Sequence, residues 1–300
     1  MNSFPGLSIL IPIYNFDVLA LVKELQKQVS GLGIEYEIRC YDDASDAAEL
    51  KEGNRKLDEI EGVVYTEFKE NKGRSMIRNL LAQESNYDLL LFIDSDSKIV
   101  DDTFIEKYLH AANDCDVVAG GTTYSDEHSD MYSLRLKYGK QREELNASSR
   151  SEKPYSNISL NNLLIHKQVF LKHLLDEQIL KYGHEDTKFA FSLKQAEVNI
   201  CHIDNPVEHI GLEENAVFLS KTEDGVANFL YLIKQGYVQE TKLFKAYRLL
   251  QKLKLSGLFL AGFALYRKTL QKNLLSASPN LLLFDLYKLQ LLIRFSRKKH

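Results

Sequence analysis

Two aspartates separated by one serine follow a run of five apolar residues, and this triplet is the part of the sequence best suited to chemistry. Asp94, Ser95 and Asp96 come directly after Leu89–Ile93, so the two carboxylates point to the same side of an extended chain. Such carboxylates repel each other unless a cation lies between them. Oxygen ligands favour a hard ion such as Mg²⁺ or Mn²⁺, which can also hold phosphate oxygens. The triplet predicts a divalent metal site, with ordinary helix capping as the alternative for each aspartate alone.

A second pair of acids, Glu185 and Asp186, follows a Gly-His dipeptide at the predicted start of a helix. A carboxylate held at a helix N-terminus can act as the general base that accepts a hydroxyl proton. The alternative is that both acids only complement the helix dipole. The aspartate pair upstream favours the catalytic interpretation.

The first 120 residues alternate between short apolar runs and helix-like segments. The expected strands span residues 7–13, 35–41, 62–66, 88–93 and 116–119. The expected helices span residues 16–30, 46–60, 73–84 and 101–113. This alternation predicts an α/β fold with a mostly parallel sheet and helices on both faces. Ligands bind at the carboxyl ends of such strands, where the acidic triplet lies.

The remainder of the chain is less regular. Residues 121–158 are polar and predict a helix plus a mobile loop. A strand at 159–165, a helix at 167–176, a helix from 185 and a strand at 199–203 are expected next. After residue 211 the pattern is helical to the end of the chain.

Five motifs, in this order and spacing, resemble the inverting glycosyltransferases of family 2, which have the GT-A fold. They are LSILIPIYN, YDDAS, NKGRSMIRN, LLLFIDSDS and GHEDTKF, and the resemblance covers roughly residues 6–211. It implies a Rossmann-like GT-A catalytic domain over residues 1–215 and a helical extension over residues 216–300. It also implies a nucleotide-sugar donor, and a divalent metal, Mn²⁺ or Mg²⁺, held by the DxD motif.

The resemblance assigns one group of residues to the donor nucleotide. These are Pro12, Tyr14, Asn15, Asp43, Arg78, Asp94 and Ser95. Asp43 would accept a hydrogen bond from the base, usually uracil, and Asp94 would lie near the ribose. Arg78 would lie near the diphosphate, with a surface ion pair as the alternative.

The resemblance also assigns the metal and the base. Asp96 would ligate the metal, and His209 would complete the metal or diphosphate site, unless it is an ordinary packed histidine. Asp186 would be the catalytic base, and Glu185 would bind the acceptor or orient the loop.

Two positions depart from the family's pattern. Ala44 replaces the usual glycine after the acidic pair and is expected to tighten that turn, and Arg74 replaces a small or apolar residue. The role of Arg74 stays open. Asn161 and Asn162 could line the donor sugar or serve only turn chemistry.

The last 60 residues are strongly basic, although the whole chain has a net charge of −4. Residues 241–300 hold 13 Lys or Arg and one acid, whereas the first 240 residues hold 25 basic and 41 acidic side chains. The apolar run 255–266 is too short to span a bilayer but suits burial in its surface. We expect this tail to bind an anionic membrane surface. The alternative is a packed helical subdomain, and nucleic acid is not expected because no binding motif is present.

The cysteines and the N-terminus bear on the cellular compartment. Cys40, Cys115 and Cys201 lie far apart without a CxxC motif, so neither a disulfide framework nor a cysteine-rich zinc site is expected. No basic segment precedes the first apolar run, so no secretory signal is expected. Together with the basic tail, these features predict a cytoplasmic protein at the inner face of the cell membrane.

The resemblance to family 2 therefore implies a hexosyltransferase-type enzyme of polysaccharide biosynthesis. It would move a sugar, with inversion, from a UDP-sugar to a glycan or lipid-linked acceptor. A sugar nucleotidyltransferase is one alternative, but such enzymes usually carry a Gly-rich basic loop after the first strand, where this chain has Pro-Ile-Tyr-Asn. A catalytically silent GT-A-like binding or scaffold protein is the other, against which Asp94, Asp96 and Asp186 argue.

Overall fold

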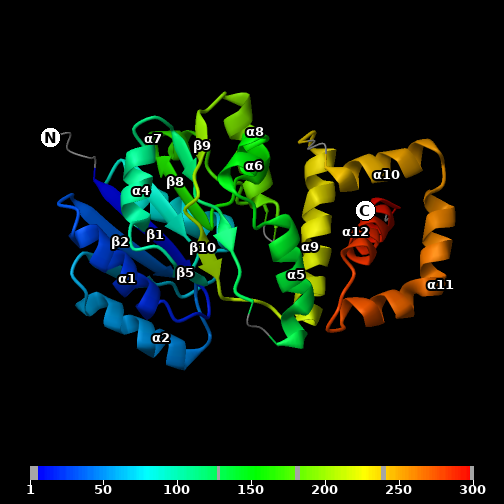
Figure 1. Cartoon of the computed structure of the whole chain (residues 1–300), viewed down its shortest axis with the longest axis horizontal. Coiled ribbons are helices and arrows are strands. Elements are labelled where there is room, and N and C mark those ends of the chain that lie inside the picture. Colours follow the sequence, from blue (N-terminus) through cyan, green and yellow to red (C-terminus); the bar gives the residue numbers. More distant parts are fainter. Residues whose placement is uncertain (1–5, 127–128, 180–182, 238–240, 298–300) are drawn as a thin grey trace. The chain divides into compact units, whose positions relative to one another are not determined.

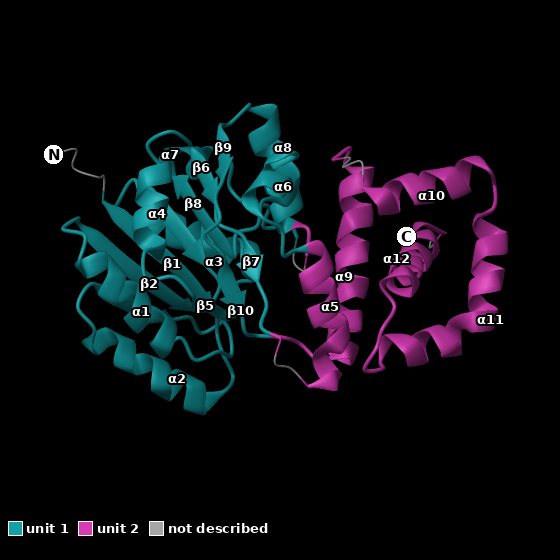
Figure 2. Ribbon diagram, in the orientation of Figure 1, with its two compact units in different colours: residues 1–125, 143–180, 185–211 teal, residues 126–142, 181–184, 212–300 magenta. Residues whose placement is uncertain are grey.

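The computed structural model describes residues 6–126, 129–179, 183–237 and 241–297, and the chain forms two compact units (Figure 2). The first, the α/β unit, comprises Met1–Ser125, Glu143–Leu180 and Glu185–Gly211. The second, the helical unit, comprises Asp126–Arg142, Lys181–His184 and Leu212–His300. The chain thus leaves the α/β unit twice and returns before its final crossing after Gly211.

A seven-stranded sheet in the order β3-β2-β1-β4-β8-β6-β9 is the frame of the α/β unit. Figure 1 shows this sheet with helices such as α1 and α4 beside it. The strands are β1 Leu7–Ile13, β2 Tyr36–Asp42, β3 Val63–Glu67, β4 Leu89–Ile93, β6 Val117–Ala119, β8 Asn162–His166 and β9 Ile200–His202. Strands β1 to β4 are mutually parallel, so their carboxyl ends meet at one edge, whereas β8 is antiparallel to β4 and β6. The predicted mostly parallel sheet flanked by helices is confirmed.

Side chains alternate along β1, and this alternation explains why helices cover both faces of the sheet. Leu7, Ile9 and Ile11 join one core with α1 and α4, while Leu10 joins the opposite core with α3, α7 and α8. The helices are α1 Leu19–Ser30, α2 Ala48–Asn54, α3 Arg74–Glu84, α4 Phe104–Ala111, α6 Ala147–Ser151, α7 Lys167–Lys172 and α8 Glu185–Gln195. Helix α8 begins with Glu185 and Asp186 of the predicted site, and α3 carries Arg78 in its second turn.

A small second sheet, which the sequence analysis did not predict, has the order β5-β10-β7. Its strands are β5 Ser97–Ile99, β7 Thr122–Thr123 and β10 Val207–His209. Two or three residues are too few for an alternating pattern to stand out. The antiparallel pairing of β10 with β5 sets His209 opposite Ser97, one residue after the acidic triplet.

The polar segment 121–158 contains the predicted helix, and its other described residues form more regular elements than the single loop that was expected. It contains β7, short 3-10 turns, α6 and the helix α5 Ser133–Arg142. Helix α5 lies in the helical unit, although residues 1–215 were expected to form the first domain. The reason is packing, because Leu134 is fully buried among apolar side chains that include Phe218 and Leu281.

The helical unit is built from α5 and four later helices, which confirms the predicted C-terminal helical extension. They are α9 Asn215–Lys234, α10 Lys242–Lys252, α11 Ser256–Leu274 and α12 Leu281–Arg297. Helix α12 contacts α9, α10 and α11 (Figure 1). No single helix of the described ranges is long and apolar enough to cross a membrane; α10 and α11 meet the length and composition requirement only as a pair, bent by 116°.

No disulfide framework was expected from the sequence, yet two of the three cysteines are paired. Cys115 and Cys201 form a disulfide, with their Cα atoms 5.9 Å apart. Strands β6 and β9 are neighbours, and Val118 pairs in register with Cys201. The sequence hides this proximity, because 86 residues separate the two cysteines. Cys40 is a free, buried thiol in β2.

Candidate active site

Hydrogen bonds tie together the loops that follow β1 and β2. Oδ1 of Asn15 accepts hydrogen bonds from the backbone N–H groups of Asp46 and Ala47, at 3.0 and 3.1 Å. The N–H of Asn15 donates to Oγ of Ser45 at 2.8 Å. Asn15 and Ala44 both have positive φ, 52° and 60°. Glycine adopts this conformation without strain, which explains why the resembled family usually has glycine where this chain has Ala44.

Asp43 holds the loop that leads into α3. One carboxylate oxygen accepts from the backbone N–H of Lys72 at 2.6 Å, and the other accepts from the N–H of Gly73 at 3.0 Å. Nδ2 of Asn71 donates to the Asp43 carbonyl at 2.9 Å. Gly73 has φ 84° and precedes the first residue of α3. The chain therefore turns sharply at Gly73, and α3 begins close to the carboxyl ends of the parallel strands.

Two arginines of α3 and two acids form a charged cluster at that edge. The buried guanidinium of Arg78 forms an ion pair with Asp94 at the end of β4, and Nη1 of Arg78 donates to the carbonyl of Arg74 at 3.1 Å. Nε of Arg74 donates to Oε1 of Glu185 at 2.6 Å, and Nη2 lies 3.9 Å from Oδ2 of Asp94. Arg74, whose role the sequence left open, thus joins the acidic triplet to the start of α8.

The two arginines keep these acids ionised. Burial opposes ionisation of Asp94, but attraction to Arg78 and Arg74 outweighs it and lowers the pKa of this carboxyl. Burial likewise opposes ionisation of Glu185, and the Arg74 guanidinium outweighs it, so the pKa of Glu185 is also lowered. Both carboxyls therefore carry negative charge at neutral pH.

Asp186 behaves in the opposite way. Burial raises the pKa of Asp186 to about 7, and the negative charge of Glu185 acts in the same direction, against the weaker pull of Arg78 and Arg74. Oγ of Ser159 donates a hydrogen bond to Oδ2 of Asp186 at 3.2 Å. A carboxylate with a pKa near 7 can accept a proton at neutral pH and release it again.

Asp96 and His209 meet through the small sheet. Nδ1 of His209 lies 3.5 Å from Oδ1 of Asp96, and the N–H of Ile210 donates to the Asp96 carbonyl at 2.9 Å. A Cβ atom on Gly211 would lie 2.5 Å from Cβ of Asp96, so only glycine fits there. The ring of Tyr124 packs edge-on against the His209 ring at 5.7 Å.

Three buried polar atoms of the site have no hydrogen-bond partner in the described part of the chain. They are Nε of Arg78, Oε2 of Glu185 and Nε2 of His209. Buried polar groups are normally paired, so unpaired ones mark places where a ligand can supply the partner. No cluster of three or more His, Cys, Asp or Glu side chains in the described ranges could hold a metal ion by itself.

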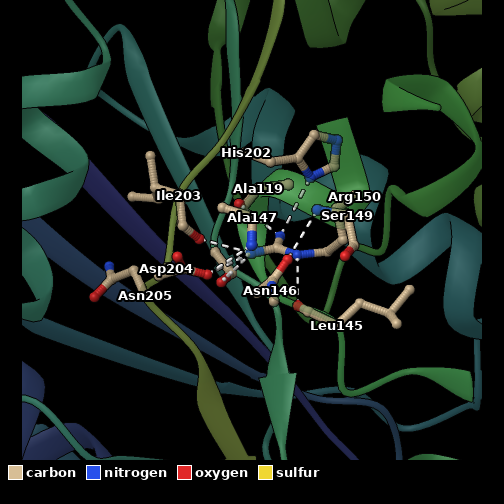
Figure 3. A network of polar contacts seen from close by, with 12 residues as sticks. Ala119, Leu145, Asn146, Ala147, Ser149, Arg150, His202, Ile203, Asp204 and Asn205 are labelled. Carbon is tan, nitrogen blue, oxygen red and sulfur yellow. Dashed lines mark hydrogen bonds and ion pairs between the residues drawn. The ribbon is translucent and has the colours of Figure 1, made fainter. Parts of the chain in front are cut away.

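Arg150 is the main residue at this edge that the sequence analysis missed (Figure 3). Its buried guanidinium donates to the carbonyls of Ala119, Gly120 and Ile203 at 2.7–2.9 Å, and Nη1 lies 3.2 Å from Nδ1 of His202. Through these hydrogen bonds, the Arg150 guanidinium holds α6 against the carboxyl ends of β6 and β9. The isolated arginine has no sequence signal, because its partners are backbone carbonyls.

Asn161 and Asn162, for which two roles were open, make contacts within the protein. Nδ2 of Asn162 donates to the carbonyls of Gly121 and Asn205 at 2.8 and 2.9 Å, and the hydroxyl of Tyr108 donates to its Oδ1 at 2.6 Å. Nδ2 of Asn161 donates to Oγ1 of Thr122 at 2.8 Å. Asn162 is thus a buried structural residue.

The structure brings most of the predicted site residues to one edge of the sheet. Arg78, Asp94 and Glu185 form one cluster, and Asp96 and His209 form a pair. The predicted donor loops are held by the bonds of Asn15 and Asp43 described above. Pro12 and Ser95 are half-buried at the ends of β1 and β4, and Tyr14 is 53% exposed, so its ring is open to a ligand.

Comparison with known proteins agrees with this geometry. The model of the family described as Glycosyl transferase family 2 matches residues 8–173, more than half of the chain. The mannosyltransferase PcManGT from Pyrobaculum calidifontis, solved with GDP-Man and Mn²⁺, is similar in structure, with a TM-score of 0.60 and 12% identity; the match covers 99% of this chain and 89% of that one.

The fragment 1–349 of TarS from S. aureus, solved with UDP, is also similar, with a TM-score of 0.50, 15% identity and 75% of this chain covered. The present chain spans only 65% of that TarS fragment. No protein among the curated ones matches the sequence. The family match and these structures confirm the predicted GT-A fold.

Proposed function

The chain belongs to glycosyltransferase family 2, and from this premise we propose that it moves a sugar from a UDP-sugar to a hydroxyl of a glycan or lipid-linked acceptor, with inversion. Family membership supports nucleotide-sugar glycosyl transfer and favours it over nucleotide-sugar synthesis. PcManGT is described with GDP-Man and TarS with UDP, so both nucleotides belong in any donor screen.

The observation that carries the proposal is the state of Asp186. Inversion in one displacement needs a base that takes the acceptor proton on the side opposite to the leaving nucleotide diphosphate. The pKa of Asp186 is raised to about 7 by burial and by Glu185, while its neighbour Glu185 stays ionised beside Arg74. Asp186 therefore has the proton affinity that a base needs at neutral pH.

We assign the leaving diphosphate to Arg78. Arg78 is buried, its ion-pair partner Asp94 directly follows β4, and its Nε has no hydrogen-bond partner in the described part of the chain. A fixed guanidinium in a site of low polarity stabilises negative charge that builds up as the bond to the sugar breaks. The ion pair with Asp94 fixes the Arg78 guanidinium in position. It leaves the N–H group at Nε free to donate to a ligand.

Asp96 and His209 are suited to a divalent cation. Oδ1 of Asp96 and Nδ1 of His209, 3.5 Å apart, form a mixed oxygen and nitrogen donor pair that Mn²⁺ accepts. When bound there with the donor, a divalent cation would neutralise charge on the diphosphate. The two side chains alone do not complete a coordination shell, so donor oxygens would have to supply the remaining ligands.

Calorimetry with UDP- and GDP-sugars, with and without Mn²⁺, tests the donor site. We expect Asp96→Ala to abolish the Mn²⁺-dependent part of donor binding, while Asp102→Ala, on an exposed aspartate of another loop, keeps it. Unchanged metal-dependent affinity in Asp96→Ala would remove Asp96 from the site.

Transfer assays with the donor identified in this way test the base. We expect Asp186→Asn to retain donor affinity and to lower turnover by roughly 10²-fold or more, the range for loss of a general base. Near-normal transfer by this variant would refute the assignment and leave Glu185 as the candidate. Failure to find transfer with any donor would favour the silent scaffold alternative.

A further inference from the structure

Helices α10 and α11 of the helical unit, with the turn between them, expose an unusual run of large apolar side chains. Six of the 18 exposed large apolar side chains of the described residues lie between residues 249 and 266. They are Leu249, Leu253, Leu255, Leu258, Leu265 and Tyr266. Leu258 is 72% exposed and Leu265 is 83% exposed, which is unusual for leucine. We refer to these six residues as the apolar strip.

Helix α11 is apolar on two opposite faces, and only one of them is covered. Leu270 and Leu274 are buried in the helical unit, and Phe263 packs against the same core. Leu258 and Leu265 are seven residues, or two helical turns, apart, so both lie on the same face of α11, away from Leu270 and Leu274. The face that carries Leu258 and Leu265 therefore does not contribute to the core of the helical unit. Its exposure to water is unfavourable.

Positive charge surrounds the apolar strip. Residues 242–272 contain eight Lys or Arg and no acid. On α10, Leu249 lines a shallow hollow of about 420 Å³ together with Lys245, Arg248 and Lys252. The apolar strip and the basic side chains around it match a partner that has both an apolar part and anionic groups. A purely polar or purely apolar partner would satisfy only one of the two.

We propose that α10 and α11 dock the protein on the surface of an anionic lipid bilayer, with the apolar strip buried at the headgroup boundary and the basic side chains on the lipid phosphates. Interfacial helices bind by this combination of buried apolar area and attraction to anionic lipid. A nucleic acid would cover the charges but leave the leucines in water. A second copy of the chain would cover the leucines but bring eight positive charges against eight others.

The chain contains no tryptophan, which permits a direct test. Leu258→Trp in the full-length protein gives a single emission reporter on the strip, and Leu174→Trp, at an exposed leucine of the α/β unit, is the matched control. With vesicles of 30% phosphatidylglycerol in phosphatidylcholine, we expect a blue shift of the Leu258→Trp emission and none in the control. Pure phosphatidylcholine vesicles should give a much smaller shift.

Two further variants separate charge from apolar burial. In the Leu258→Trp background, Lys252→Gln with Lys268→Gln should weaken partitioning about 25-fold, at about fivefold for each charge, and should reduce its salt dependence. Leu265→Ser should weaken it about tenfold and remove part of the binding that survives high salt. Circular dichroism spectra that match the parent protein establish that these variants are folded.

Three results would overturn the proposal. The first is the absence of a shift with anionic vesicles at low salt, and the second is equal binding to neutral and anionic vesicles. The third is a dimer in light scattering without lipid that Leu265→Ser dissociates, since a second copy would then be the occupant of the strip. None of these results depends on glycosyl transfer, so the proposed function is tested separately.

Discussion

Replacement of Asp186 by asparagine should stabilise the folded protein at alkaline pH. The same replacement removes the carboxylate that we propose as the catalytic base. The pKa of this carboxyl is raised from 3.8 to about 7 in the folded state. An acid with a raised folded-state pKa contributes stability that is present below the unfolded value and is lost as the pH rises through the folded value. Asparagine does not titrate, so Asp186→Asn keeps the stability that the parent protein loses between about pH 4 and pH 7.

The size of this effect follows from the shift. Each pH unit is worth about 1.4 kcal/mol, so a displacement of about three units sets a ceiling of about 4 kcal/mol above pH 7. Asp186 is not wholly shielded from water, so solvent screening lowers the expected gain to about 2–3 kcal/mol. Below pH 4 the difference between the two proteins should be small.

Urea unfolding of both proteins at several pH values between 4 and 8.5 measures this difference, and Asp102→Asn serves as the control for loss of an exposed carboxylate. NMR titration of ¹³C-labelled aspartate carboxyls, with Asp186→Asn to assign the signal, gives the pKa directly. Parallel stability curves for Asp186→Asn and the parent protein would refute the reasoning. Asp186 would then be an ordinary surface acid, unsuited to act as a base at neutral pH.

Three other substitutions follow from contacts in the α/β unit. Arg74→Gln removes a cation that lowers the pKa of Asp186, so the midpoint of the pH–rate profile should move to higher pH; a profile that stays in place would exclude this role. Gly211→Ala places a Cβ against Asp96 and should weaken Mn²⁺-dependent donor binding, measured by calorimetry, while metal-free binding changes less. Arg150→Met leaves buried carbonyls unpaired and should cost about 3 kcal/mol or more in urea unfolding.

The sequence predicts those parts of the fold in which neighbouring residues form a clear hydrophobic pattern. Leu89–Ile93 is a continuous apolar run that ends in two acids, and such a run has few alternatives to a buried strand with a polar edge. The parallel registers of β1, β2 and β4 then bring their carboxyl ends together, as predicted. The resemblance added the roles of Arg78 and Asp186, which spacing alone does not provide.

The parts that the sequence does not predict depend on long-range contacts. The pairing of β10 with β5 links residues about 110 positions apart and places His209 beside Asp96, yet each strand has only three residues. Helix α5 joins the helical unit through the burial of Leu134 among side chains much later in the chain. The partners of Arg150 are carbonyls, which every residue carries, so no residue pattern marks them.

Arg74 shows how a departure from the family's pattern can be absorbed by the site. Glu185 and Asp186 are adjacent acids at the start of α8, and two buried negative charges so close together would destabilise each other. Arg74 forms an ion pair with Glu185, and Arg78 forms one with Asp94, so among the described residues of the cluster Asp186 is the acid without an ion pair. Burial and, after it, the negative charge of Glu185 therefore raise the pKa of Asp186, while attraction to the arginines lowers the pKa of Glu185 and of Asp94. The arginine that the family usually lacks thus helps to decide which of the acids can accept a proton at neutral pH.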